Sequence, residues 1–173
     1  KIKSEHGNIE ILINNAGITK DAPLHKVQKE AWEQVINVNL NSIFNLTSNV
    51  INEMRDNGFG RIIHISSVNG QKGQFGQTNY AATKSALIGF SKSLALESAS
   101  KGITSNVIAP GYINTEMVAA IREDILNKIV DTIPTKRLGK SEEIAEMVLY
   151  LVSNKASYIN GATLSINGGL WMD

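Results

Sequence analysis

Short apolar runs alternate along the chain with longer segments in which apolar residues recur every three or four positions. The short runs predict β-strands, and the first of them, IEILIN, is typical of a strand buried on both faces. The predicted strands lie at residues 9–14, 60–66, 103–110 and 162–167. The longer segments predict helices at residues 29–54, 78–100 and 141–153, the last of them capped by the hydroxyl of Ser141.

The order of these elements predicts the fold class. Strands that alternate with helices form a mostly parallel sheet with right-handed crossovers and helices on both faces. We therefore expect one α/β domain with a doubly wound sheet over residues 1–173. Ligands bind such sheets beyond the carboxyl ends of the strands. Those ends carry the motifs NNAG, SSVNG and PGYINT, at residues 14–17, 66–70 and 110–115.

Composition narrows the choice of partners. The net charge is +1, and the basic residues are scattered among acidic ones, so neither nucleic acid nor a membrane is expected as a partner. There is no cysteine, which fits a reducing compartment, and we expect a cytoplasmic protein. The three histidines have no metal-ligand spacing, so no metal site is predicted. His64, within a predicted strand, is interpreted as a packed side chain.

A tyrosine and a lysine stand four positions apart in NYAATK. On a helix this spacing places Tyr80 and Lys84 on one face, although it fits a simple surface pair equally well. Ser67 ends the preceding strand, and the crossover can bring its hydroxyl towards Tyr80. A phenol has a pKa of about 10 in water, and a neighbouring ammonium lowers it. The three residues therefore predict a phenol that exchanges a proton with an alcohol or a developing alkoxide.

Asn39 lies in the apolar stripe of the first long helix, where a buried amide would need partners. Either it turns to the surface or bonds locally, or it holds a water or a backbone carbonyl in line with Lys84. Gly17 would allow a ligand close to the backbone, but NAG also occurs in ordinary turns. The PGYINT loop is either a turn or a loop that faces a ligand amide with the Ile113 backbone and the Thr115 hydroxyl.

NNAG, NVNL, GRIIHISS, YAATK and PGYINTEM, in this order, resemble the motifs of the short-chain dehydrogenase/reductase family, and the resemblance covers essentially the whole chain. It implies that Tyr80 donates the proton and that Ser67 polarises the substrate carbonyl. It also implies that Lys84 lowers the pKa of Tyr80 and binds the nicotinamide ribose, and that Asn39 anchors a proton-relay water. The cofactor-binding residues that it implies are Asn15, Ala16, Gly17, Tyr80, Lys84, Pro110, Gly111, Ile113 and Thr115.

Within the family, SSVNGQKGQFGQTNY and SINGGLWM are similar to the acetoacetyl-CoA reductases of the polyhydroxybutyrate pathway. This implies reduction of the 3-keto group of acetoacetyl-CoA with NADPH, with NADH still open. The 3-oxoacyl-acyl-carrier-protein reductases share most of these motifs and are the alternative. Residues 117–136 would form a mobile lid. The residues expected at the acyl group are Asp21, Gln74, Phe75, Gln77 and Tyr112.

The family's glycine-rich turn, which holds the cofactor pyrophosphate and distinguishes NADH from NADPH, has no counterpart in this sequence. The resemblance thus implies the C-terminal part of a Rossmann-like sheet, without its first three strands. Residues 11–13 would then form an unpaired apolar edge, and we expect the chain not to fold stably alone. It is either part of a longer reductase or a truncated, non-catalytic remnant. Family packing also implies a homotetramer, and the helix at 78–100 is apolar on more than one side.

Overall fold

The computed structural model describes residues 2–119 and 121–172. One sheet of parallel strands has the order β1-β2-β3-β4. The strands are β1 (Ile11–Asn14), β2 (Gly60–Ile65), β3 (Ile103–Pro110) and β4 (Thr163–Ile166). All of the predicted strands are present, and the α/β fold class with a parallel sheet is confirmed.

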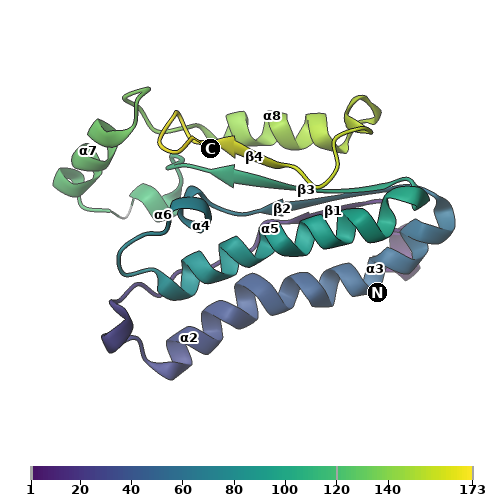
Figure 1. Cartoon of the computed structure of the whole chain (residues 1–173), viewed down its shortest axis with the longest axis horizontal. Helices are drawn as coiled ribbons and strands as arrows, with labels where there is room; N and C mark the ends of the chain where they lie inside the picture. Colours follow the sequence, from purple (N-terminus) through teal and green to yellow (C-terminus); the bar gives the residue numbers. More distant parts are fainter. Residues whose placement is uncertain (1, 120, 173) are drawn as a thin grey trace.

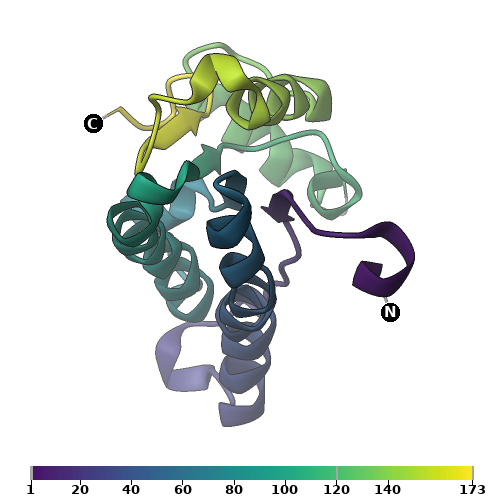
Figure 2. The same cartoon turned by 90° about the vertical axis from the view of Figure 1, so that its right-hand side faces the viewer.

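Helices cover both faces of this sheet, as Figures 1 and 2 show. One face carries α2 (Lys29–Ile36), α3 (Ser42–Asn57) and α5 (Thr78–Ser98), and the other carries α8 (Ser141–Val152). The chain begins with the short helix α1 (Ile2–His6), as the segment KIKSEHG indicated. The sequence pattern missed the shorter helices α4 (Val68–Lys72), α6 (Glu116–Ala119) and α7 (Glu123–Thr132). The last two lie in the segment expected to be a lid, of which residue 120 is outside the described residues.

The helix predicted at 29–54 is interrupted by a π-helical turn, Asn37–Asn41. The apolar stripe continues on both sides of this turn, so the spacing of apolar residues gave no sign of it. A π turn widens the helix locally, and such turns are frequent at functional sites. Here the turn contains Asn39, whose side chain is completely buried.

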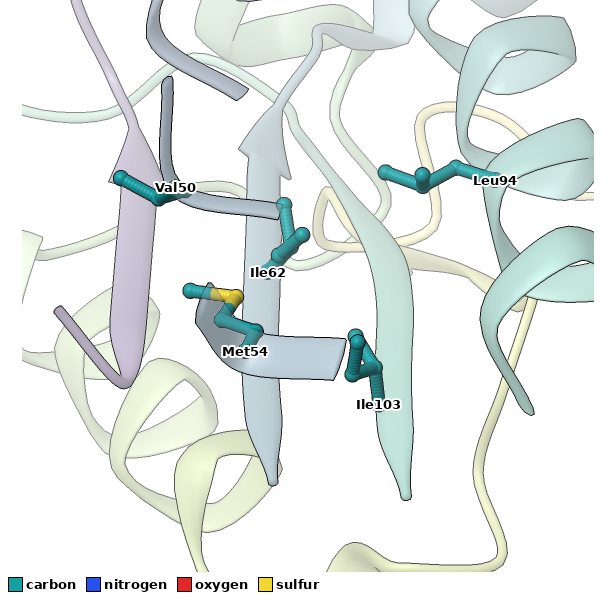
Figure 3. Close-up of a cluster of buried hydrophobic side chains, with 5 residues drawn as sticks. All are labelled: Val50, Met54, Ile62, Leu94 and Ile103. Atoms are coloured by element: carbon teal, nitrogen blue, oxygen red, sulfur yellow. The ribbon is translucent and has the colours of Figure 1, made fainter. Parts of the chain in front are cut away.

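Each face of the sheet has its own hydrophobic core. Figure 3 shows the cluster under α3 and α5, formed by Val50, Met54, Ile62, Leu94 and Ile103. The cluster under α8 contains Ile63, Ile108, Leu151 and Ala156. Successive strand residues point to opposite faces, so Ile62 and Ile63 serve different clusters. This requirement explains the unbroken apolar runs in the sequence.

His64 lies on β2 and is completely buried. Its Nδ1 is 3.2 Å from Asn14 Nδ2, its Nε2 is 3.3 Å from Ser105 Oγ, and its ring meets Phe90 edge-on. Burial lowers the pKa of His64 to about 4. The interpretation of His64 as a packed, hydrogen-bonded side chain is confirmed.

The prediction that Ser141 caps α8 is wrong. The N-cap is Lys140, whose backbone N–H donates to Glu143 Oε2 at 2.7 Å. A glutamate three positions after the cap can reach back in this way and satisfy the free N–H without a capping hydroxyl. Arg137 holds the same carboxylate through two hydrogen bonds, of 2.6 and 2.8 Å, and so fixes the start of α8.

β1 forms one edge of the described sheet. The side chains of Ile11 and Ile13 are 43% and 45% exposed, whereas Leu12 packs against the core under α3 and α5. The prediction that these residues form an apolar edge agrees with this arrangement. An exposed apolar edge strand favours pairing with another strand.

Candidate active site

The parallel register brings the predicted motifs to one end of the sheet. Asn14 pairs with His64 and Ile65 with Ile108, so NNAG, SSVNG and PGYINT all begin at the carboxyl end of the sheet. The loop after β3 also lies tightly against the end of β4. A Cβ added to Gly111 would lie 2.8 Å from the Cα of Asn167, so that position requires a glycine.

Ser67, Tyr80 and Lys84 lie close together at this end of the sheet. Lys84 Nζ donates a 2.7 Å hydrogen bond to the carbonyl of Ile65 and lies 5.6 Å from the centre of the Tyr80 ring. Ser67 Oγ caps α4 by accepting the Asn69 N–H at 3.1 Å, and the same hydroxyl lies close enough to the Tyr80 phenol to influence its pKa. Tyr80 and Lys84 are therefore not a simple surface pair.

Burial raises the pKa of Tyr80 above its ordinary value. The hydrogen bond with Ser67 opposes this rise, and the negative charge of Asp21 adds to it. The resemblance implied that Lys84 lowers the pKa of Tyr80, whereas burial makes the overall change a rise. Tyr80 is therefore protonated at neutral pH, which suits a proton donor.

Lys84 itself is buried, and burial lowers its pKa to about 8. Desolvation disfavours the charged form of an amine, and its hydrogen bond with a carbonyl compensates only in part. Lys84 thus remains mostly charged at neutral pH, yet its charge is more sensitive to alkaline pH than that of a surface lysine.

Asn39 is buried and organises the backbone beside Lys84. Its Oδ1 accepts the N–H of Ile18 at 2.8 Å, and its Nδ2 donates to the carbonyl of Ile18 at 3.0 Å and to Thr83 Oγ1 at 3.2 Å. The sequence left open whether Asn39 turns to the surface or holds a backbone group. The structure shows the second arrangement, and the backbone group belongs to Ile18. A Cβ on Gly17 would lie 3.2 Å from Lys84 Nζ, so the glycine leaves room for this packing.

Two hollows meet at Ser67 and Tyr80. The first, here called the Lys84 hollow, has a volume of about 670 Å³ and reaches α8. The second, here called the Tyr112 hollow, has a volume of about 260 Å³ and reaches α6. The residues that line both are Ser67, Tyr80, Gly111, Ile113 and Thr115. A group bound in one hollow therefore meets a group bound in the other beside these shared residues.

Most of the predicted site residues line one of these hollows. Those in the Lys84 hollow are Asn15, Gly17, Tyr80, Lys84, Pro110, Gly111, Ile113 and Thr115. Those in the Tyr112 hollow include Asp21, Gln77 and Tyr112. Ala16, Asn39, Gln74 and Phe75 are outside both linings, and the Phe75 side chain is 86% exposed.

The sequence interpretation missed two parts of the site. One wall of the Lys84 hollow is the face of α8 that carries Ile144, Ala145 and Val148. Their helical spacing indicated only a core-facing stripe. Asn69 in the Tyr112 hollow was also missed, because an asparagine after a strand is usual in turns.

The residues described at 2–119 and 121–172 contain no cluster of three or more His, Cys, Asp or Glu side chains suited to a metal ion. No helix in the same ranges is long and apolar enough to span a bilayer. The Lys84 hollow instead offers apolar walls with a few polar groups, such as Asn15 and Thr115, which suits an organic cofactor.

A parallel sheet with helices on both faces, with a buried lysine and a tyrosine between two hollows at the carboxyl ends of its strands, is typical of oxidoreductases of the Rossmann-like class. A family model described as "Enoyl-(Acyl carrier protein) reductase" matches residues 1–171. The chain belongs to the short-chain dehydrogenase/reductase family.

Individual relatives are similar over almost the whole chain. Acetoacetyl-CoA reductase of Cupriavidus necator is 56% identical over 99% of this chain and 70% of its own length. Nodulation protein G of Azospirillum brasilense is 56% identical over 98% of this chain and 69% of its own length. The 3-oxoacyl-acyl-carrier-protein reductase of Escherichia coli is 50% identical over 99% of this chain and 70% of its own length.

Proposed function

We propose that this protein reduces the 3-keto group of acetoacetyl-CoA to give 3-hydroxybutyryl-CoA, with NADPH as reductant. The observation that carries the proposal is the position of Tyr80 and Ser67, which line both hollows where they meet. The names of several relatives, including the C. necator and Shinella zoogloeoides acetoacetyl-CoA reductases, support the choice of substrate.

In this proposal, separate residues of the chain polarise the ketone, protonate it and stabilise the resulting phenolate. Ser67 donates a hydrogen bond to the carbonyl oxygen and so polarises the carbonyl. Tyr80, whose pKa is raised by burial, gives its proton to that oxygen as negative charge develops. Lys84 lies close enough for its ammonium to stabilise the phenolate that remains. Asn39 keeps the backbone of Ile18 in place beside Lys84.

The Lys84 hollow is proposed to hold the nicotinamide part of the cofactor, which supplies the hydride when it is bound. Asn15, Gly17 and Lys84 would line one side, with Ile113 and Thr115 at the carboxamide. The glycine supports this assignment, because a side chain at position 17 would crowd Lys84 Nζ. NADPH rather than NADH is proposed from the sequence resemblance, and initial rates with each reductant would test it.

The substrate is tested by following NADPH oxidation by the intact protein with acetoacetyl-CoA, acetoacetyl-acyl carrier protein and crotonyl-CoA. We expect the highest kcat/KM with acetoacetyl-CoA and no turnover of crotonyl-CoA, which has a double bond but no ketone. A preference for the carrier-protein substrate would favour the second candidate, a 3-oxoacyl-acyl-carrier-protein reductase, which the E. coli relative supports. Failure to reduce either ketone would contradict both and favour a non-catalytic chain.

We also propose that the active form contains a further strand paired with β1. Ile11 and Ile13 leave an apolar edge beside the Lys84 hollow, and Ile13 lines that hollow. A strand on this edge would cover the isoleucines and complete the wall of the cofactor site. This chain spans about 70% of the length of the relatives that it matches.

A homotetramer is proposed on similar grounds. A groove of about 380 Å³ lies between α3 and α5, with Phe44 and Phe90 among its lining residues. Phe44 is 62% exposed, and Leu96 on α5 is 87% exposed. Apolar side chains exposed in this way on neighbouring helices favour association with a second copy. Light scattering should give a mass of four subunits that falls for Phe44→Glu, whereas an unchanged mass in that variant would contradict this interface.

A further inference from the structure

Another cavity lies at the amino end of the sheet, opposite Ser67 and Tyr80. This cavity, here called the Arg61 cavity, has a volume of about 510 Å³. Its polar and aromatic lining residues are Phe59, Arg61, Thr104, Ser157, Tyr158 and Asn160. Since a strand rises about 3.3 Å per residue, Arg61 lies about 13 Å along β2 from Ile65, which lines the Lys84 hollow. The Arg61 cavity is therefore separate from the candidate active site.

Arg61 and Thr104 are partners in the parallel register of β2 and β3. The strand residues next to them, Ile62 and Ile103, belong to the hydrophobic cluster under α3 and α5. Because successive strand residues point to opposite faces, Arg61 and Thr104 both point to the face that carries α8. Two polar side chains thus lie side by side near the amino end of the sheet.

The Arg61 guanidinium is held in place without a counter-ion. The side chain is 3% exposed, and both of its hydrogen bonds to described residues come from Nη1, which donates to the carbonyls of Gly60 and Gly102 at 2.8 and 3.0 Å. Its Cζ lies 4.4 Å from the centre of the Phe59 ring. Among the described residues, no carboxylate forms an ion pair with Arg61, and burial lowers its pKa. Buried charges in proteins are normally paired.

Two hydrogen-bond donors at this place have no partner. Arg61 Nε and Thr104 Oγ1 are buried and make no hydrogen bond within the described residues. Such groups are rare in native proteins, and a bound ion or ligand is one physical reason for them. Because Nη1 is already used, the Nε and Nη2 side of the guanidinium remains for a ligand. A planar edge of this kind binds carboxylate and phosphate groups through two parallel hydrogen bonds.

We propose that the Arg61 cavity is a second binding site, for a small organic molecule that carries a phosphate or carboxylate group. The oxyanion would accept hydrogen bonds from Arg61 and Thr104. No Asp or Glu is among the described residues that line the cavity, so no charge there repels an anion. The volume lies in the range of small-molecule sites, and the rings of Phe59 and Tyr158 offer apolar surface to the rest of the ligand. This site is independent of the proposed reductase function.

The test is isothermal titration calorimetry of the intact protein with phenyl phosphate and with benzoate, which carry different anions on the same ring. We expect one site per chain, and the tighter probe identifies the anion that the site prefers. Arg61→Met should weaken that binding about tenfold to a hundredfold, because it removes hydrogen bonds donated by a charged group. Arg61→Lys keeps the charge but loses the planar edge. It should also weaken binding, and it covers the case in which methionine does not fold.

Arg55→Met is the matched control, because Arg55 also donates to a backbone carbonyl, that of Glu97, but lies outside the cavity lining. Its affinity for the probe should equal that of the wild type, with or without saturating NADPH. Three results would overturn the proposal: neither probe binds, Arg61→Met binds as tightly as the wild type, or NADPH displaces the probe. None of them bears on ketone reduction, because the readout is binding of the probe alone.

Discussion

Lys84 places a positive charge in the protein interior, with its Nζ 5.6 Å from the centre of the Tyr80 ring. The charge is tolerated because Nζ donates to the carbonyl of Ile65 at 2.7 Å, but burial still lowers the pKa of Lys84 to about 8. A free lysine has a pKa of 10.5, so the folded protein loses this proton at a lower pH than the unfolded chain does. Between these values the unfolded state binds more protons, and stability must increase with pH.

This linkage predicts the behaviour of Lys84→Met in urea unfolding of the intact protein. The free energy of unfolding of the wild type, minus that of the variant, should increase as pH rises from 8 to 10.5. The full increase should be about 3 kcal/mol, at about 1.4 kcal/mol for each unit between the two pKa values. A difference that stays constant or falls over this range would show that Lys84 is not a desolvated amine.

At the residue scale, the motifs were sufficient to predict where Ser67, Tyr80 and Lys84 gather. They could not predict the direction of the pKa change of Tyr80, because that depends mainly on how deeply the fold buries the phenol. The hydrogen bonds from Asn69 to Gln77 and from Gln77 to Asp21 were hidden for a similar reason. Asp21 and Gln77 are fifty-six positions apart in the sequence, and only the fold brings them together.

The contact between α4 and α5 sets the geometry of the site at the scale of elements. Ser66 Oγ donates to the carbonyl of Lys84 at 2.7 Å, and a Cβ added to Gly70 would lie 2.8 Å from the backbone carbonyl carbon of Lys84. The two helices therefore pack so closely that only a glycine fits at position 70. This packing determines how far Ser67, at the start of α4, lies from Tyr80 on α5.

Gly70→Ala should therefore damage both stability and catalysis. The added methyl group must push α4 from α5, which should cost about 1–3 kcal/mol in urea unfolding. The same displacement should lower kcat about tenfold or more, because small errors in the position of catalytic groups are costly. Wild-type kcat in a folded Gly70→Ala protein would contradict the view that this packing positions Ser67.

Long elements were predictable from the sequence, and short ones were not. The core-facing residues of α5 and α8 repeat over several turns, and the strand interiors are unbroken apolar runs. α4 has only five residues, too few for a periodic pattern. The π-helical turn at Asn37–Asn41 leaves the apolar stripe in place, so it too required the three-dimensional structure.

The exposed edge of β1 matters for the whole molecule. Ile11 and Ile13 are accessible on a strand whose outer backbone groups have no strand neighbour in the described sheet. Native proteins protect such edges with lysine, with short strands or with a covering segment. The sequence motifs implied this edge through the family's strand order, whereas apolar periodicity alone would have predicted only a buried strand.

The edge predicts how the 173-residue chain behaves when it is produced alone. We expect it to associate or to unfold without a cooperative transition, and the Ile11→Lys, Ile13→Lys double variant to associate less, as measured by sedimentation velocity. Leu24→Lys, which removes another exposed apolar side chain away from the sheet, is the control and should not reduce association. A monomeric wild-type chain with a cooperative melt would refute this expectation.

The account depends most directly on the hydroxyl of Tyr80 as proton donor to a ketone. The decisive measurement is kcat of Tyr80→Phe in the intact protein, with NADPH and acetoacetyl-CoA at saturating concentrations. Loss of a general acid should lower kcat by on the order of 10²–10⁴-fold with a similar KM. Tyr158→Phe, at a fully exposed tyrosine, should behave like the wild type. A Tyr80→Phe protein that reduces the ketone at the wild-type rate would contradict the assignment.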